Sequence, residues 1–372
     1  MRQGCNLQNL SLYFDLPNPS IFTNYEPGIK NLRNLHSLHS FTDKYEFLSM
    51  LSIICNNIIE YNIIIGKSNE INPISDIIKL QPLEKIFIEF SYSNITKKFI
   101  QKIIKALEFR SKTLKKLVFK YLDFQSIELS FITKLECLKH LDFQYCSGLE
   151  QKHCKTLSKK KSQINYFSLW YNYDDVYDDV KLINGTKTMI DYVAGESLRR
   201  LDLNVVTLEI IREIKESCPN ITFLHIKIEE EFQDSVSSVI SLICDLSSLK
   251  ILNIQADNYT HSIIRILGDC LRSVESLYLS FFVDLISFEY FTINCKANLK
   301  NWIIPRDISY FDNNTKGFLE CVSNYQKVHN SLKKLGVRDR EIDKEELKII
   351  INYLMNQGVN VVSETSIALE MF

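Results

Sequence analysis

The stretch CLKHLDFQYCSGLE, residues 137–150, decides the fold of this chain. It places Leu138, Leu141 and Phe143 at spacings of three and then two, and Cys146 follows three residues later. A cysteine in this setting could belong to a metal site, a reactive thiol or a structural repeat. Internal repeats are therefore sought first, because a fixed recurrence points to a repeat architecture.

The same apolar-x-x-apolar-x-apolar hexamer recurs along the whole chain. Thirteen copies occur, and neighbouring copies start 23 to 34 residues apart. An Ile- and Leu-rich chain produces a few such hexamers by chance, but not a quasi-regular series of this length. The copies are LQNLSL from Leu7, LHSLHS from Leu35, IIEYNI from Ile58, LEKIFI from Leu83, LKKLVF from Leu114, LKHLDF from Leu138, INYFSL from Ile164, LRRLDL from Leu198, ITFLHI from Ile221, LKILNI from Leu249, VESLYL from Val274, LKNWII from Leu299 and LKKLGV from Leu332.

The segments between the hexamers carry helical patterns. NITKKFIQKIIKALEFRSK (94–112) has apolar residues at helical spacing, and Asn94 or Thr96 could cap its start. A further helix is predicted over 343–358, where Gly358 is a stop signal. Similar helical patterns occupy residues 207–218, 235–246 and 260–271. Each repeat is therefore predicted to form a short strand, a turn, a helix and a return.

A strand–helix unit of this length is typical of leucine-rich repeats, which bury their apolar stripes only by stacking on their neighbours. We predict an α/β leucine-rich-repeat solenoid of about 13 repeats, with a parallel sheet on its concave face and helices on its convex face. Residues 1–372 are expected to form a single domain. Its terminal repeats, 1–34 and 332–372, are expected to be atypical. A loop insertion is expected near 171–197, within the longest step between hexamers.

Composition and charge narrow the functional classes. The formal net charge is −1, which produces no global attraction to nucleic acid or to an acidic membrane. The N-terminal segment lacks the apolar run of a signal peptide, and the most apolar window, residues 47–65, is too polar to span a bilayer. Ten cysteines in such a chain are expected to be free thiols in a reducing compartment. We therefore expect a cytoplasmic or nuclear protein.

The cysteines follow the repeat. CPNITFLHI (218–226) and LKHLDFQYC (138–146) fit the patterns C-P-N-ϕ-x-x-L-x-ϕ and L-x-x-L-x-ϕ-x-x-C. These motifs resemble the cysteine-containing repeats of F-box/leucine-rich-repeat proteins, and the Ile-, Asn- and Lys-rich composition is similar to fungal expansions of that family. The resemblance covers residues 5–362. It implies the substrate-recognition part of an SCF-type, cullin-based ubiquitin ligase.

The chain departs from that family at its start. An F-box would precede the repeats and dock a Skp-type adaptor, but the first hexamer already begins at Leu7. We expect either a chain truncated at its start or a member that works without the ligase. Adaptor and cullin are therefore expected as partners only if an F-box is supplied. The alternative function is that of a free-standing cytosolic scaffold or inhibitor.

No motif for catalysis, for a cofactor or for a metal stands out. GKS (66–68) lacks the first glycine of a phosphate loop, and no paired spacing of a zinc site occurs. Cys146, His153 and Cys154 are the best metal candidates, but a second pair is missing, so buried structural thiols are the preferred interpretation. The Tyr- and Asp-rich segment 171–185 could bind a basic peptide or form a solvated acidic loop. We predict a protein that is not an enzyme.

Binding is expected on the strand residues that alternate with the buried ones. Aromatic and arginine side chains, which dominate interface energies, are placed there together with histidine and aspartate. For Trp170 and Phe223 the alternative is lateral packing on neighbouring strands. We predict a groove that binds a protein, without nucleic-acid or membrane partners, formed by His140, Asp142, Tyr166, Trp170, Arg200, Asp202, Phe223, His225 and Tyr278.

Overall fold

The computed structural model divides the chain into two compact units, Met1–Leu198 and Arg199–Phe372. Each unit is described by itself, and the prediction of one domain over 1–372 stays a prediction. The structure describes residues 7–12, 32–41, 45–66, 71–91, 96–154, 157, 162–172, 180–193, 195–228, 233–256, 260–303, 306–307, 315–337 and 345–371.

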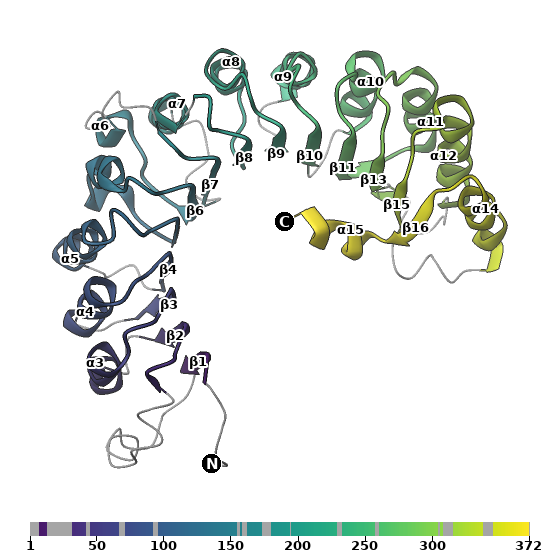
Figure 1. Ribbon diagram of the computed structural model, residues 1–372. Coiled ribbons are helices and arrows are strands. Elements are labelled where there is room, and N and C mark those ends of the chain that lie inside the picture. Colours follow the sequence, from purple (N-terminus) through teal and green to yellow (C-terminus); the bar gives the residue numbers. More distant parts are fainter. Residues whose placement is uncertain are drawn as a thin grey trace. The chain divides into compact units, whose positions relative to one another are not determined.

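The N-terminal unit alternates strands with helices (Figure 1). Each of its strands pairs in parallel with the next strand along the chain. The helices cover one face of this sheet and leave the other face to the strands. The strands are β1 (Asn9–Leu12), β2 (Ser37–Phe41), β3 (Glu60–Ile65), β4 (Lys85–Phe90), β5 (Lys116–Lys120), β6 (His140–Cys146) and β7 (Tyr166–Tyr171). The helices are α3 (Tyr45–Ile54), α4 (Asn72–Leu80), α5 (Lys97–Glu108), the 3₁₀ turns η1 (Phe124–Ser126) and η2 (Leu129–Lys134), α6 (Gln151–Cys154) and α7 (Val180–Val193).

The C-terminal unit repeats this pattern (Figure 1). Its main strands are again parallel neighbours in chain order. They are β8 (Arg200–Leu203), β9 (Phe223–Ile228), β10 (Ile251–Ala256), β11 (Ser276–Ser280), β13 (Asn301–Ile303), β15 (Lys334–Val337) and β16 (Asn360–Ser363); the short strands β12 (Phe282–Val283) and β14 (Arg306–Asp307) form a separate parallel pair. The helices are α8 (Leu208–Ser217), α9 (Gln233–Cys244), α10 (Thr260–Cys270), α11 (Leu285–Asn294), α12 (Thr315–His329), α14 (Glu345–Asn356) and α15 (Glu364–Met371).

The predicted α/β leucine-rich-repeat solenoid is confirmed. Every one of the thirteen hexamers starts two residues before a strand, from Leu7 ahead of β1 to Leu332 ahead of β15. Strand β16 was not predicted, because the residue two positions before it is Gly358 and not an apolar residue. Gly358 has a φ of +81° and ends α14, as its role of stop signal predicted.

In most of the described hexamers the first, fourth and sixth side chains are buried in the core. Leu138, Leu141 and Phe143 are at most 2% exposed. Parallel register aligns Phe143 with Phe119 of β5, and their rings stack with centroids 6.0 Å apart. The continuous core of stacked repeats is therefore built from residues that repeat in the sequence.

The helix starts follow ordinary capping chemistry. The hydroxyl of Thr96 accepts a hydrogen bond from the backbone N–H of Phe99, so α5 begins at Lys97. Thr207 accepts in the same way from Ile210 and starts α8. Asn94, the other cap candidate for α5, lies outside the described residues.

The segment near 171–197 is only in part what the sequence predicted. Residues 173–179 lie outside the described part of the chain, but Val180–Val193 forms α7 instead of a loop. The helix forms because Leu182, Met189 and Ile190 share a face and are buried. Its backbone also packs closely on the chain before α6, since a Cβ on Gly185 would lie 3.0 Å from the carbonyl oxygen of Leu149.

Candidate functional site

The strand face of the N-terminal unit carries four of the predicted binding residues. His140 of β6 and Tyr166 of β7 stack face to face, with ring centroids 3.9 Å apart and an interplanar angle of 21°. Asp142 is buried and accepts a 2.7 Å hydrogen bond from the Gln144 amide. Trp170 is half-buried on the same face of β7. In this unit the structure brings the predicted residues onto adjacent, paired strands.

Two exposed tyrosines extend this face and were not predicted. Tyr121 directly follows β5 and Tyr145 lies within β6, and their rings stack with centroids 5.5 Å apart. They are 46% and 36% exposed. Both backbones are left-handed, with φ of 58° and 52°. The sequence does contain one sign of these tyrosines. FKYLDF (119–124) and FQYCSG (143–148) both carry a tyrosine two residues after a buried phenylalanine, at the same place in consecutive repeats.

A register shift explains why Tyr145 is exposed. The pairing of β6 with β7 is irregular between Phe143 and Cys146, as in a β-bulge. The extra residue lets both Phe143 and Cys146 point into the core, so Tyr145 turns outward. The pattern of alternating strand residues does not foresee this, because a bulge breaks the period of two.

Charged groups on this face are paired. The ammonium group of Lys120 lies 3.2 Å from Glu89 and 5.0 Å and 5.9 Å from the ring centroids of Tyr121 and Tyr145. Burial opposes the charge on Lys120, but the hydrogen bond and charge of Glu89, with smaller contributions from both tyrosines, raise its pKa above the ordinary value. Lys116 covers the ring of Phe87 at 5.0 Å. The paired charges leave the aromatic rings as the distinctive exposed groups.

The predicted residues of the C-terminal unit are more buried. The guanidinium of Arg200 lies over the ring of Phe223 at 4.0 Å from its centroid, and Nδ1 of His225 lies 3.0 Å from Oδ1 of Asp202. Phe223 is 5% exposed and Tyr278 is 6% exposed. Arg200 contacts Phe223 and Asp202 contacts His225 across the paired strands β8 and β9, which is the lateral packing considered for Phe223.

The thiols fit the structural role preferred from the sequence. The Cys55 thiol donates to the carbonyl oxygen of Leu32 at 3.1 Å, and the Cys137 thiol donates to that of Lys112 at 3.2 Å, in each case in the preceding repeat. Burial raises the pKa of Cys55 and of Cys154 to about 12. These two thiols are therefore protonated at neutral pH and unsuited to nucleophilic catalysis.

The Cys and His side chains of residues 146–154 are each hydrogen-bonded to backbone groups. Cys146 points into the core, and Cys154 donates to the carbonyl oxygen of Gly185 at 3.8 Å. Nδ1 of His153 accepts the backbone N–H of Glu150 at 3.0 Å. Among the described residues, no group of three or more His, Cys, Asp or Glu side chains is placed to hold a metal ion.

The environment of His153 predicts that the folded protein becomes less stable in acid. Burial lowers its pKa, nearby Lys152 lowers it further, and Glu150 and Asp123 act in the opposite direction. Because the folded-state pKa lies below the ordinary value of 6.5, the unfolded chain binds the proton more tightly. The contribution of His153 to the free energy of unfolding is therefore fully present above about pH 6.5 and is lost as the pH drops below that value.

The check is urea unfolding of wild type and His153→Asn between about pH 5 and 8. Asparagine retains an acceptor for the Glu150 N–H but does not titrate, so the pH dependence of the unfolding midpoint should be less steep. An identical slope for the two proteins would contradict this role of His153.

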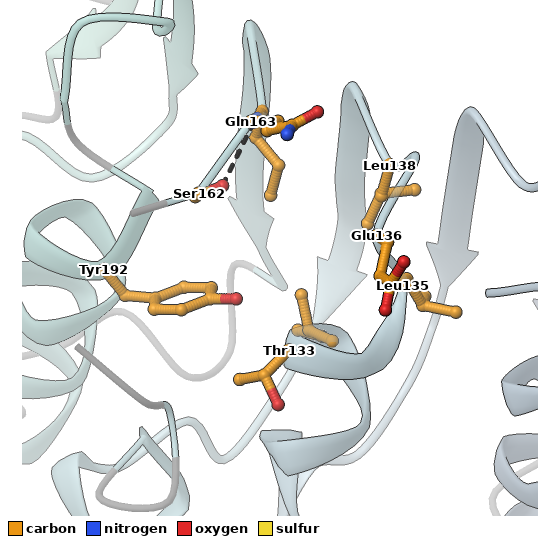
Figure 2. Close-up of a pocket in the computed structure, with 9 residues that line it drawn as sticks. Thr133, Leu135, Glu136, Leu138, Ser162, Gln163 and Tyr192 are labelled. Atoms are coloured by element: carbon orange, nitrogen blue, oxygen red, sulfur yellow. Dashed lines mark hydrogen bonds between the residues drawn. The ribbon is translucent and has the colours of Figure 1, made fainter. Parts of the chain in front are cut away.

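A shallow pocket of about 210 Å³ lies in the helix layer of the N-terminal unit (Figure 2). Ile132 and Thr133 of η2 line it, and the ring of Tyr192 from α7 points into it toward Thr133. Burial raises the pKa of Tyr192. Glu136 is the acidic group of the lining and is exposed, so the lining presents no paired acid and base for catalysis.

In the part of the chain that the structure describes, no helix is long and apolar enough to cross a membrane. No protein-family model matches the chain, and no curated protein matches it. Among solved structures, the chain is similar to one chain of the crystal structure of the Rad7 and Elc1 complex in yeast. That similarity has a TM-score of 0.42 and 12% sequence identity, and it covers 95% of this chain and 90% of the other.

Proposed function

We propose that this protein is a non-catalytic recognition protein that binds a protein partner on the strand face of its N-terminal unit. The observation that carries the proposal is the exposed stack of Tyr121 and Tyr145, together with Trp170 on the neighbouring strand β7. Tyrosine and tryptophan are the residues that most often supply the binding energy of protein interfaces. We call Tyr121, Tyr145 and Trp170 the aromatic strip.

Backbone strain supports a functional role for the strip. A left-handed conformation costs a residue with a Cβ roughly 1–2 kcal/mol, and glycine or asparagine would adopt it more readily. Two consecutive repeats nevertheless place tyrosine there and leave its ring half-exposed. Strained residues that present a side chain to solvent are a feature of binding sites.

The other predicted residues take supporting parts in this proposal. His140 of β6 and Tyr166 of β7 form a second stack, and Asp142 with Gln144 on β6 offers a polar contact near both stacks. We assign Arg200, Asp202, Phe223, His225 and Tyr278 to a separate surface of the C-terminal unit. The burial of Asp202, Phe223, His225 and Tyr278 suits these four residues to shaping that surface more than to direct contact.

The test compares two triple variants of the full chain. Tyr121→Asn, Tyr145→Asn and Trp170→Ala together remove the strip, and asparagine keeps the left-handed backbone unstrained. The matched control removes three exposed apolar residues from the helices of the same unit or next to them, Ile53→Ala, Leu80→Ala and Phe109→Ala. Proteins captured from cells by wild type should be retained by the control and reduced more than about tenfold by the strip variant. Equal capture by both variants would refute the proposal.

The specific form that we propose is the substrate-recognition part of an SCF-type ubiquitin ligase. The cysteine-bearing motifs support it, and the thiol of the motif residue Cys146 donates to the carbonyl oxygen of Phe119 in the preceding repeat at 3.8 Å. Co-purification of the cellular protein with a Skp-type adaptor and a cullin is the expected result. Capture of partners without adaptor or cullin would favour the free-standing scaffold or inhibitor instead. Either form places the protein in the cytoplasm or nucleus.

A further inference from the structure

The last helix lies on the opposite face of the sheet from the other helices of its unit. In Figure 1, α15 extends from β16 on the strand side, whereas α14 and α12 lie on the helix side. The chain passes from β16 to α15 without an intervening residue, while four residues separate β8 from α8. Ser363 ends the strand and also caps the helix, because its hydroxyl accepts the N–H of Thr365 at 3.2 Å.

A glycine makes room for this helix. Gly336 occupies an outward position of β15, between the buried Leu335 and Val337. A Cβ at residue 336 would lie 2.9 Å from Cγ1 of Ile303, 3.1 Å from Cδ1 of Ile367 and 3.3 Å from Cα of Glu364. A side chain at this position would therefore crowd Ile303, Ile367 and the first residue of α15.

The corresponding position carries a side chain in most other strands of the unit. Asp202, His225, Asn253 and Tyr278 fill it in β8, β9, β10 and β11, and the register pairs Ile303 with Gly336. The strand face therefore has a notch at β15, lined by Ile303. Ile367 fills this notch and is 2% exposed. We call Ile303 and Gly336 the notch.

We propose that the notch is a binding site for a short amphipathic helix, and that α15 is its internal, displaceable ligand. The partner that fits is a helical segment that presents a branched aliphatic side chain, as Ile367 does. Two features make α15 displaceable. It has eight residues, too few for a helix that is stable without tertiary contacts, and it is tethered at its N-terminal end through β16. This proposal lies in the C-terminal unit and is independent of the aromatic strip.

The covalent link between β16 and α15 determines how tightly the free α15 peptide must bind the notch in the test. A short tether gives α15 an effective concentration of about 1 mM at the notch. An α15 that is mostly docked therefore implies that the same segment, added as a free peptide, binds an open notch with a Kd below about 1 mM.

The experiment uses the full chain and a fluorescein-labelled, acetylated peptide of residues 363–372, SETSIALEMF. Ile367→Asp places a charge in the apolar notch, so it should release the chain's own α15 and leave the notch open. Fluorescence anisotropy should show saturable peptide binding to this variant below about 1 mM and several-fold weaker binding to wild type. Ile349→Asp, the same change at an exposed position of α14, should behave as wild type.

Adding Gly336→Val to Ile367→Asp should abolish peptide binding, while hydrogen exchange of β13 and β15 stays as in wild type and shows that the unit is folded. Absence of binding to Ile367→Asp would overturn the proposal, as would binding that Gly336→Val leaves unchanged. In wild type, amides of α15 should exchange faster than those of β15. Equal protection would show a fixed cap and would also overturn it.

Discussion

Replacing Phe143 with alanine should lower the free energy of unfolding by about 3–5 kcal/mol, the usual cost of removing a buried aromatic ring. Phe143 is fully buried at the centre of an aromatic cluster. Its ring lies 5.0 Å from that of Phe124, 6.0 Å from that of Phe119 and 6.4 Å from that of Phe167, between centroids. The substitution removes contacts with β5, η1 and β7 at once, so the loss extends across three successive repeats.

Urea unfolding followed by circular dichroism measures this loss, and hydrogen exchange locates it. Because repeats are stabilised by their neighbours, protection should fall first in β5, β6 and β7. Phe109→Ala is the control, since this ring is 63% exposed and should cost less than about 1 kcal/mol. A similar cost for both substitutions would contradict the placement of Phe143 in the core.

Replacing Trp302 with alanine should be as costly in the C-terminal unit, about 3–5 kcal/mol. Trp302 is fully buried, and its ring centroid lies 5.3 Å from Phe288, 5.4 Å from Phe291 and 5.5 Å from Tyr325. These contacts join β13 to α11 and α12. The alanine variant would leave a cavity between the sheet and both helices.

The same residue allows a sharper comparison. Among the described residues, the indole Nε1 of Trp302 has no hydrogen-bond partner, and a buried unpaired donor is unfavourable. Trp302→Phe keeps most of the ring contacts and removes this donor, so it should cost clearly less than Trp302→Ala. Urea midpoints of the two variants provide the test. Equal losses would show that the indole N–H contributes to stability through a partner.

The strand positions were predictable because they depend on a local rule. Residues that alternate along a strand face opposite sides, so the hexamer identifies both the strand and its buried face. This holds for β6, which the opening stretch contains, and for the other strands that follow a hexamer. It fails for β16, where Gly358 replaces the first apolar residue to end a helix.

The candidate site was predictable only in part. The outward positions of His140, Tyr166 and Trp170 follow from the strand period. Tyr121 and Tyr145 do not, because their exposure comes from left-handed backbone and from a register shift against β7. A bulge depends on how two strands pair, and the pairing partner is more than twenty residues away in the sequence.

The amino-acid sequence by itself determined the repeat, the strands and which residues of each strand face the core, because these follow from spacing within a few residues. Tertiary structure decided which outward residues stay exposed. Phe223 and Tyr278 are at outward positions but are covered by their neighbours, whereas Tyr121 and Tyr145 are exposed. It also decided where α15 lies, since Gly336 gains its role only when Ile303 and Ile367 meet beside it. Exposure and fit depend on side chains brought together from different repeats, and such contacts have no signature in any one repeat.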